Sequence, residues 1–127
     1  MVWEFSYDKP VYIQIIEELK IRMISGVYKP GERIPSVREL AEEARVNPNT
    51  MQKALSELER EGFLVSLRTS GRIVTADESV IRTLKDNSAE NAVREFGETM
   101  GRIGVSPEDA IELLRKYYCE KNKTNEG

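Results

Sequence analysis

Apolar residues recur at intervals of three and four along the first half of the chain, which is the spacing of one face of an α-helix. Three stripes follow one another: Tyr12, Ile16, Leu19 and Met23; then Val37, Leu40, Ala41 and Ala44; then Met51, Ala54, Leu55 and Leu58. The pattern predicts three amphipathic helices, over about residues 10–25, from residue 36 to about residue 44, and from residue 47 to about residue 61.

Signals typical of helix ends stand where these stripes begin and stop. Pro10 suits the first helical position, and Gly26 follows the end of the first helix. Ser36 and Glu39 are spaced as a capping box, in which each side chain serves the other residue's backbone N–H. Gly62 provides the left-handed residue that often ends a helix.

The third predicted helix has a polar face opposite its apolar stripe. Asn47 is the expected N-cap and Pro48 the first helical residue. The polar face consists of Asn49, Gln52, Lys53 and Ser56, which include one positive charge and no acid. A helix that enters the major groove of DNA needs such a face, because a carboxylate there would meet phosphates. Asn and Gln can pair with adenine, and Lys can reach guanine or phosphate.

Two short β-rich runs follow the helices, Phe63–Leu67 and Ile73–Thr75. Between them stands the turn Arg68-Thr69-Ser70-Gly71-Arg72, which predicts a hairpin with a basic tip. Such a tip can reach a minor groove, where glycine permits close approach. The fold class expected is therefore mainly α with a small β-hairpin wing, that is, a winged helix-turn-helix.

The remaining residues predict a short helical region. Asp77 is expected to cap a helix whose stripe runs from Val80 to Ile103, with a plausible break near Asn87 and Ser88. A last helix is expected from residues 106–107, with Ile111, Leu114 and Tyr117 or Tyr118 on its apolar side. We expect a winged helix-turn-helix domain at 9–77, a C-terminal helical dimerisation region at 78–119 and a disordered polar tail at 120–127.

The amino-acid composition argues against several classes of function. The chain has no histidine and one cysteine, Cys119, so histidine-based catalysis and an internal disulfide are excluded. No metal-ligand cluster, phosphate-binding glycine loop or nucleophile-plus-base pair stands out, so no cofactor and no enzymatic activity are expected. The longest stretches without a charged residue, 10–16 and 46–52, are too short for a membrane span. A cytoplasmic protein with no membrane partner is expected.

The net charge of −3 is unevenly distributed. Residues 1–76 carry 11 Lys or Arg and 11 Asp or Glu, whereas residues 77–127 carry 8 and 11. The segments 44–56 and 62–76 contain no acid and hold Arg45, Lys53, Arg68 and Arg72. A balanced average can hide a surface that suits a polyanion, although chance spacing is the alternative.

Several segments in this order resemble the DNA-binding domain of GntR-family bacterial transcription regulators. They are PVYIQI at 10–15, GVYKPGERIPSVRELA at 26–41, VNPNT at 46–50, LEREG at 58–62 and SGR at 70–72. The resemblance covers about residues 9–77, and the NPNT opening with the short two-helix tail is similar to the YtrA-type branch. It implies a homodimer joined through the C-terminal helices, which represses operons that often encode ABC transporters. The tail looks too short for the effector-binding domains of other branches.

The resemblance also implies roles for individual residues. Arg38 would contact phosphate or base, Asn47, Asn49 and Thr50 would contact DNA from the head of the recognition helix, and Ser70 and Gly71 would form the wing tip. Several family members have arginine where this chain has Pro48 and Gln52, so their sequence specificity does not transfer. With Gln52, Lys53, Arg68 and Arg72 from the residue patterns, the candidate DNA-binding set is Arg38, Asn47, Asn49, Thr50, Gln52, Lys53, Arg68, Ser70, Gly71 and Arg72.

Structural alternatives exist for most of these residues. Asn47 and Thr50 can serve only the first helical turn, and Arg38 can pair with Glu42. Gln52 and Lys53 can belong to an ordinary solvated face. The aromatic residues of the first segment are expected to pack or to join subunits, namely Trp3, Phe5, Tyr7 and Tyr12.

The function predicted is a dimeric, sequence-specific transcription regulator that binds double-stranded DNA at an inverted repeat, most simply as a repressor. A winged-helix protein-interaction module is the alternative from a different class, and a small-ligand sensor is a third reading. The sequence leaves open whether a small-molecule effector exists.

Overall fold

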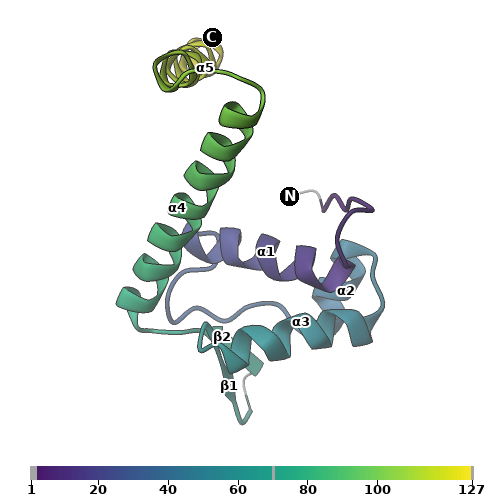
Figure 1. Ribbon diagram of the computed structural model, residues 1–127. Helices are drawn as coiled ribbons and strands as arrows, with labels where there is room; N and C mark the ends of the chain where they lie inside the picture. Colours follow the sequence, from purple (N-terminus) through teal and green to yellow (C-terminus); the bar gives the residue numbers. More distant parts are fainter. Residues whose placement is uncertain (1–2, 70, 127) are drawn as a thin grey trace. The chain divides into compact units, whose positions relative to one another are not determined.

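The computed structural model describes residues 3–69 and 71–126 (Figure 1). The chain divides into two compact units, one ending at Lys85 and the other starting at Asp86. The elements in order are α1 (Val11–Ile24), α2 (Val37–Ala44), α3 (Pro48–Arg60), β1 (Leu64–Leu67), β2 (Gly71–Val74), α4 (Glu78–Arg102) and α5 (Pro107–Glu126). The predicted class, mainly α with a small β-hairpin, is confirmed.

The helix ends follow the capping signals. The Ser36 hydroxyl accepts the Glu39 N–H at 3.1 Å, and the Glu39 carboxylate accepts the Ser36 N–H at 3.2 Å, so the capping box is formed. The Asn47 side chain caps α3 by accepting the Asn49 N–H at 2.8 Å. Pro10 is the N-cap of α1 and not its first helical residue as predicted. Arg45 ends α2 in a left-handed conformation (φ 58°), which makes the turn into α3 tight.

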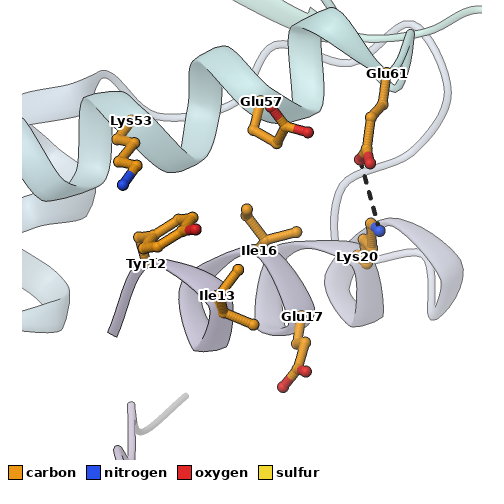
Figure 2. A pocket seen from close by; sticks show the side chains of 8 residues that line it. All are labelled: Tyr12, Ile13, Ile16, Glu17, Lys20, Lys53, Glu57 and Glu61. Carbon is orange, nitrogen blue, oxygen red and sulfur yellow. Dashed lines mark ion pairs between the residues drawn. The ribbon is translucent and has the colours of Figure 1, made fainter. Parts of the chain in front are cut away.

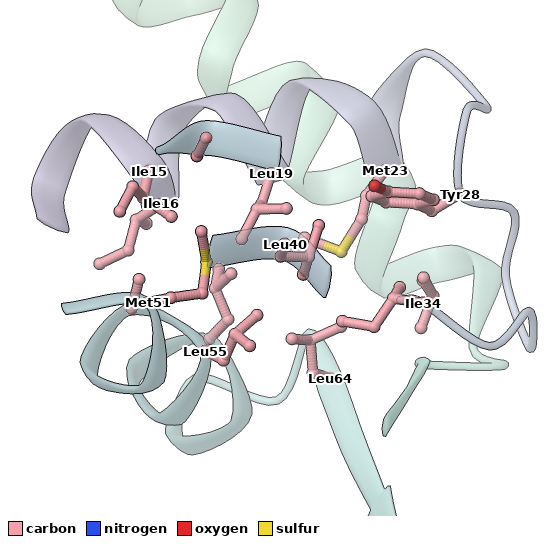
Figure 3. Packing of buried hydrophobic residues seen from close by; sticks show 14 of the residues in the cluster. Ile15, Ile16, Leu19, Met23, Tyr28, Ile34, Leu40, Met51, Leu55 and Leu64 are labelled. Carbon is pink, nitrogen blue, oxygen red and sulfur yellow. The ribbon is translucent and has the colours of Figure 1, made fainter. Parts of the chain in front are cut away.

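The core of the first unit lies between α1, α2 and α3 (Figure 3). Side chains with no exposed surface come from all three helices and β2: Ile15, Leu40, Met51, Ala54, Leu55, Leu58 and Val74. The apolar stripes of α2 and α3 therefore face inward as predicted. Tyr12 is only partly buried, and Ile15, which lies outside the predicted stripe, takes a central place.

The N-terminal segment packs on the same unit through a buried cation. Arg22 is 1% exposed and forms an ion pair with Glu43 at 3.0 Å and a hydrogen bond to the Tyr28 hydroxyl at 2.9 Å. The ring of Trp3 lies 4.4 Å from the Arg22 guanidinium, and the Trp3 indole N–H donates to Glu43 at 2.9 Å. Trp3 and Phe5 pack against the core, in agreement with the packing prediction, whereas Tyr7 is fully exposed.

The hairpin pairs Leu64 with Val74 and Leu67 with Gly71 in antiparallel register. Strand β2 begins at Gly71, two residues before the predicted start, so the turn is shorter than expected and Arg72 lies in the strand. The free edge of β2 is covered by the segment before α2. The Arg72 carbonyl accepts the Ile34 N–H at 3.1 Å, and the Glu32 carbonyl accepts the Val74 N–H at 2.9 Å. These bonds extend pairing along β2, whose earlier start follows from the pairing of Gly71 with Leu67 of β1.

The helix α4 is continuous, so the predicted break near Asn87 and Ser88 is wrong. Neither residue breaks a helix as proline or glycine would. The division between the two units falls inside α4, whereas a domain boundary at residue 77 is expected from the sequence. The helix α5 reaches Glu126, so the tail expected to be disordered from residue 120 is helical, because no proline or glycine interrupts it.

The second unit exposes many of its apolar side chains. Among the described residues of this unit, Ala110 is the one apolar residue that is buried. The large apolar residues left exposed are Val93, Ile103, Ile111, Leu113, Leu114, Tyr117 and Tyr118. Within residues 3–69 and 71–126, no helix combines the length and the apolar character that a membrane crossing needs.

Candidate nucleic-acid interface

The N-terminal end of α3 presents small polar side chains to solvent. Asn47, Asn49 and Gln52 are exposed and Thr50 is half-buried. The Asn47 side-chain oxygen is occupied by its capping bond, which leaves the amide donors of Asn47 available. Gln52 donates to the Ser56 hydroxyl at 3.0 Å one turn further on. This part of α3 therefore offers amide groups, which recognise base edges, and no carboxylate.

Lys53 has a different environment from Gln52, although both belong to the polar face. Its ammonium lies 3.8 Å from the centre of the Tyr12 ring, on the side of α3 that faces α1 (Figure 2). It lines a groove of about 420 Å³ between the two helices, which also contains the Lys20–Glu61 ion pair at 3.6 Å. A cation–π contact at an exposed site contributes roughly 0.5–1 kcal/mol. The Lys53 ammonium is therefore engaged by the Tyr12 ring in this structure.

Arg38 is exposed on α2, and the pairing with Glu42 is not formed among the residues that the structure describes. Arg68 is exposed in the hairpin turn and, within the same described ranges, also forms no ion pair. An exposed guanidinium that lacks an internal acid remains available for phosphate, which it can bind with two parallel hydrogen bonds.

Two further arginines belong to this surface and were absent from the candidate set. Arg45 stands exposed in the turn between α2 and α3. Arg33 is exposed and passes the wing, with its Nε 3.8 Å from where a β-carbon on Gly71 would stand. Arg45 could have been selected, because it lies in an acid-free segment. Arg33 could not, because its approach to the wing depends on the pairing of residues 31–34 with β2.

The residues predicted to contact DNA from the wing lie in different environments. Gly71 has a φ of 78°, a conformation that favours glycine, and it stands at the start of β2. Ser70 lies outside the described residues. The Arg72 guanidinium donates to the Glu59 carboxylate at 3.0 Å, and its side chain is only 17% exposed. The Ser66 hydroxyl and Arg72 together hold the pKa of Glu59 below its usual range. The exposed cations beside the wing are thus Arg33 and Arg68, whereas Arg72 faces inward.

No group of three metal-ligating side chains forms within the part of the chain that the structure describes. Cys119 is exposed on α5. The surface around α3 instead combines an acid-free helix end, several exposed arginines and a hairpin with a glycine at its tip. Fold and surface together define a DNA-binding protein of the winged helix-turn-helix class.

Comparison with known proteins identifies the family within this class. Residues 11–74 match the model of the bacterial regulatory proteins of the gntR family. The chain is 32% identical over 114 residues to the HTH-type transcriptional regulator YhcF of Bacillus subtilis, a match that covers 90% of this chain and 94% of YhcF. It therefore belongs to the GntR family, as its sequence motifs predict.

Two other similarities agree with this assignment. The HTH-type transcriptional repressor YtrA of Bacillus subtilis is 48% identical over 66 residues, which cover 52% of this chain and 51% of YtrA. A GntR family transcriptional regulator from Listeria monocytogenes has a similar structure, with a TM-score of 0.83 and 33% identity over 88% of this chain and 98% of the other. These proteins are transcription regulators, which confirms the expectation that the chain is not an enzyme.

Proposed function

We propose that this regulator is a dimeric repressor that binds an inverted-repeat operator with one winged unit on each half-site. The observation that carries the proposal is the exposed, acid-free N-terminal half of α3, which is bordered by arginines without acidic partners among the described residues. Such a surface suits a polyanion, and amides on a helix suit base edges.

The residue roles follow from position. Asn47, Asn49, Thr50 and Gln52 read the major groove from the first turns of α3, where recognition helices meet base edges. The phosphates are bound by Arg38 and Arg45, and the minor groove is approached by Arg33, Arg68 and the wing tip with Gly71. Lys53 joins the major-groove set when it leaves Tyr12.

The second unit supplies the dimer contact, and its partner is a second copy of the chain. Its exposed leucines and tyrosines on α5 have no core of their own to enter, and apolar patches of this kind mark association surfaces. The region involved is residues 78–119, of which residues 86–119 belong to the second unit. Two-fold symmetry then predicts half-site centres roughly 34–36 Å apart, or a multiple of this distance. A repressor role agrees with the name of YtrA. An operon for a transporter as the target, and the cytoplasm as the site of action, are part of this proposal.

The test is selection of a binding site from a random duplex library, followed by fluorescence-anisotropy titration of the selected duplex at two salt concentrations. We expect an inverted repeat, and binding that weakens steeply with salt because phosphate contacts release counterions. Asn49→Ala should weaken binding and relax specificity at one position, whereas the matched change Asn122→Ala, at an exposed position of α5 outside residues 78–119, should leave binding unchanged. No binding of any duplex at low salt would contradict the proposal and would favour a protein-interaction module.

A further inference from the structure

Glu59 lies in the second half of α3 and contacts the wing. Its carboxylate accepts the Arg72 Nε–H at 3.0 Å, and the same oxygen accepts the hydroxyl of Ser66. Ser66 and Arg72 are partners in the hairpin register, one on each strand. One acid on the recognition helix therefore binds both strands of the wing at the same rung.

The other acids at this end of α3 have different partners. Glu57 pairs with Arg60 on the helix itself, and Glu61 pairs with Lys20 on α1. Glu59 is therefore the acid of this helix end that reaches the hairpin, among the residues that the structure describes. Among the same described residues, Glu59 is also the acid that forms an ion pair with Arg72.

The wing needs such an attachment. It consists of two strands of four residues, and an isolated hairpin of this size is marginally stable at best. The segment at residues 31–34 holds one edge of β2 by backbone bonds. The bonds to Glu59 connect the hairpin directly to the recognition helix, through side chains.

We propose that Glu59, Ser66 and Arg72 form a positioning cluster that holds the wing at a set angle to α3, and that Arg72 acts through this cluster and not by contacting DNA. The inference rests on the proposed function, because the angle matters when α3 and the wing must reach adjacent grooves together. The DNA-contacting cations in and beside the wing are then Arg68 and Arg33.

The alternative role for Arg72, a direct phosphate or base contact, predicts the opposite behaviour of one variant. If Arg72 contacts DNA, the Glu59 carboxylate competes with phosphate for the same guanidinium. Glu59→Gln would then release Arg72 and strengthen binding. If Arg72 positions the wing, Glu59→Gln loosens the wing and weakens binding.

The experiment compares Glu59→Gln and Arg72→Gln with the double variant and with Glu57→Gln. The last is the matched control, because it removes the same charge from the same helix without touching the wing. Titration uses the duplex selected by the wild-type protein. We expect each wing variant to lose about fivefold in affinity, the upper end of what a partly exposed ion pair contributes, and the double variant to lose no more than either one.

Salt dependence separates the two roles further. A lost phosphate contact lowers the slope of log K against log salt by about 0.9, whereas a lost positioning contact leaves the slope of Arg72→Gln unchanged. Tighter binding by Glu59→Gln than by Glu57→Gln, or a reduced slope for Arg72→Gln, would overturn the proposal. The charge-swapped Glu59→Arg, Arg72→Glu variant should recover part of the affinity, which a direct DNA contact by Arg72 would not allow.

A measurement on the free protein keeps this inference separate from the proposed function. Residual dipolar couplings of backbone amides report the orientation of residues 64–74 relative to α3 without DNA. We expect this orientation to become variable in Glu59→Gln and to a smaller extent in Ser66→Ala, but not in Glu57→Gln. A wing that keeps its orientation in Glu59→Gln would refute the positioning role. Failure of the wild-type protein to bind any duplex would refute the proposed function alone.

Discussion

The arginine side chains of this protein differ in exposure and pairing because their neighbours in the fold differ. Arg22 is buried against Glu43 and Tyr28, Arg72 is bound by Glu59, and Arg38 is exposed without an acidic partner among the described residues. The sequence marks all three as positive and cannot distinguish them, because Glu43 and Glu59 are distant along the chain from the arginines they pair with, and because Arg38 does not pair with the nearby Glu42. Availability for phosphate is therefore decided residue by residue in the folded unit.

Arg38→Ala should weaken binding of the selected duplex by about 1–3 kcal/mol if the guanidinium touches a base, and by a smaller amount with a lower salt slope if it touches phosphate alone. The reason is that Arg38 has no acidic partner among the described residues, so its replacement removes a DNA contact and no ion pair within the protein. Anisotropy titration at several salt concentrations measures both quantities. Arg60→Ala is the control, since Arg60 already pairs with Glu57 on α3. Equal titrations for Arg38→Ala and the wild type would remove Arg38 from the interface.

The short helix α2 shows how far local signals determine an element. Its eight residues begin at a capping box and end at the left-handed Arg45, and its buried face is the predicted stripe. Ser36→Ala should lower the free energy of unfolding by about 0.5–2 kcal/mol, because the Glu39 N–H loses its acceptor.

Urea denaturation followed by circular dichroism measures this loss. Ser56→Ala is the control, because Ser56 is exposed within α3, accepts a bond from the Gln52 side chain and, among the residues that the structure describes, caps no backbone group. Equal unfolding free energies for the two variants would mean that the capping box contributes nothing to α2.

The hairpin is the element whose attachment should depend on pH. Its bonds to Glu59 lower the pKa of that carboxyl, chiefly through Ser66 and then Arg72. A lowered folded-state pKa means stabilisation that is present above the carboxyl's ordinary pKa and is lost as the pH falls through the lowered value. The difference in unfolding free energy between wild type and Glu59→Gln should be constant above about pH 5.5, should shrink as the pH falls below the ordinary glutamate pKa of about 4.3, and should be lost once the pH is below the lowered pKa of Glu59.

Urea titrations at a series of pH values test this expectation. Glu57→Gln serves as a comparison, because the pKa of Glu57 is also lowered, by Arg60, but without any bond to the hairpin. Protection of the amides at residues 64–74, taken relative to the intrinsic exchange rate at each pH, should decrease at low pH in the wild type and be small at all pH values in Glu59→Gln. Identical exchange in both proteins would show that the Glu59 bonds do not hold the wing.

On the scale of the whole molecule, the first unit has a core of its own and the second has exposed apolar side chains. If a second copy covers these side chains, Leu114→Glu should convert the dimer to a monomer, because a charge on an apolar contact is costly to bury. Sedimentation equilibrium measures the mass. Affinity for the full inverted repeat should fall much more than affinity for a single half-site, since linked units gain effective concentration.

Glu112→Ala on the same helix is the control for this prediction, as it changes an exposed polar residue. We expect it to remain dimeric. A monomeric wild-type protein, or a dimeric Leu114→Glu variant that binds the full repeat normally, would contradict dimerisation through this surface.

Local and periodic features were accessible from the sequence alone. The stripes of α2 and α3, the caps at Ser36 and Asn47, and the hairpin follow from spacing and capping chemistry, which act within a few residues. The family followed from the order of its motifs. The polar, acid-free face of α3 was also visible, because helical periodicity assigns residues to faces.

Contacts between residues far apart in the chain were decided only by the tertiary structure. The packing of Lys53 on Tyr12, the approach of Arg33 to the wing and the capture of Arg72 by Glu59 all join different elements. No periodicity encodes them, because they depend on how α1, α3 and the hairpin dock. Composition and spacing thus determined which elements form and which faces are polar, whereas docking decided which charges remain free for DNA.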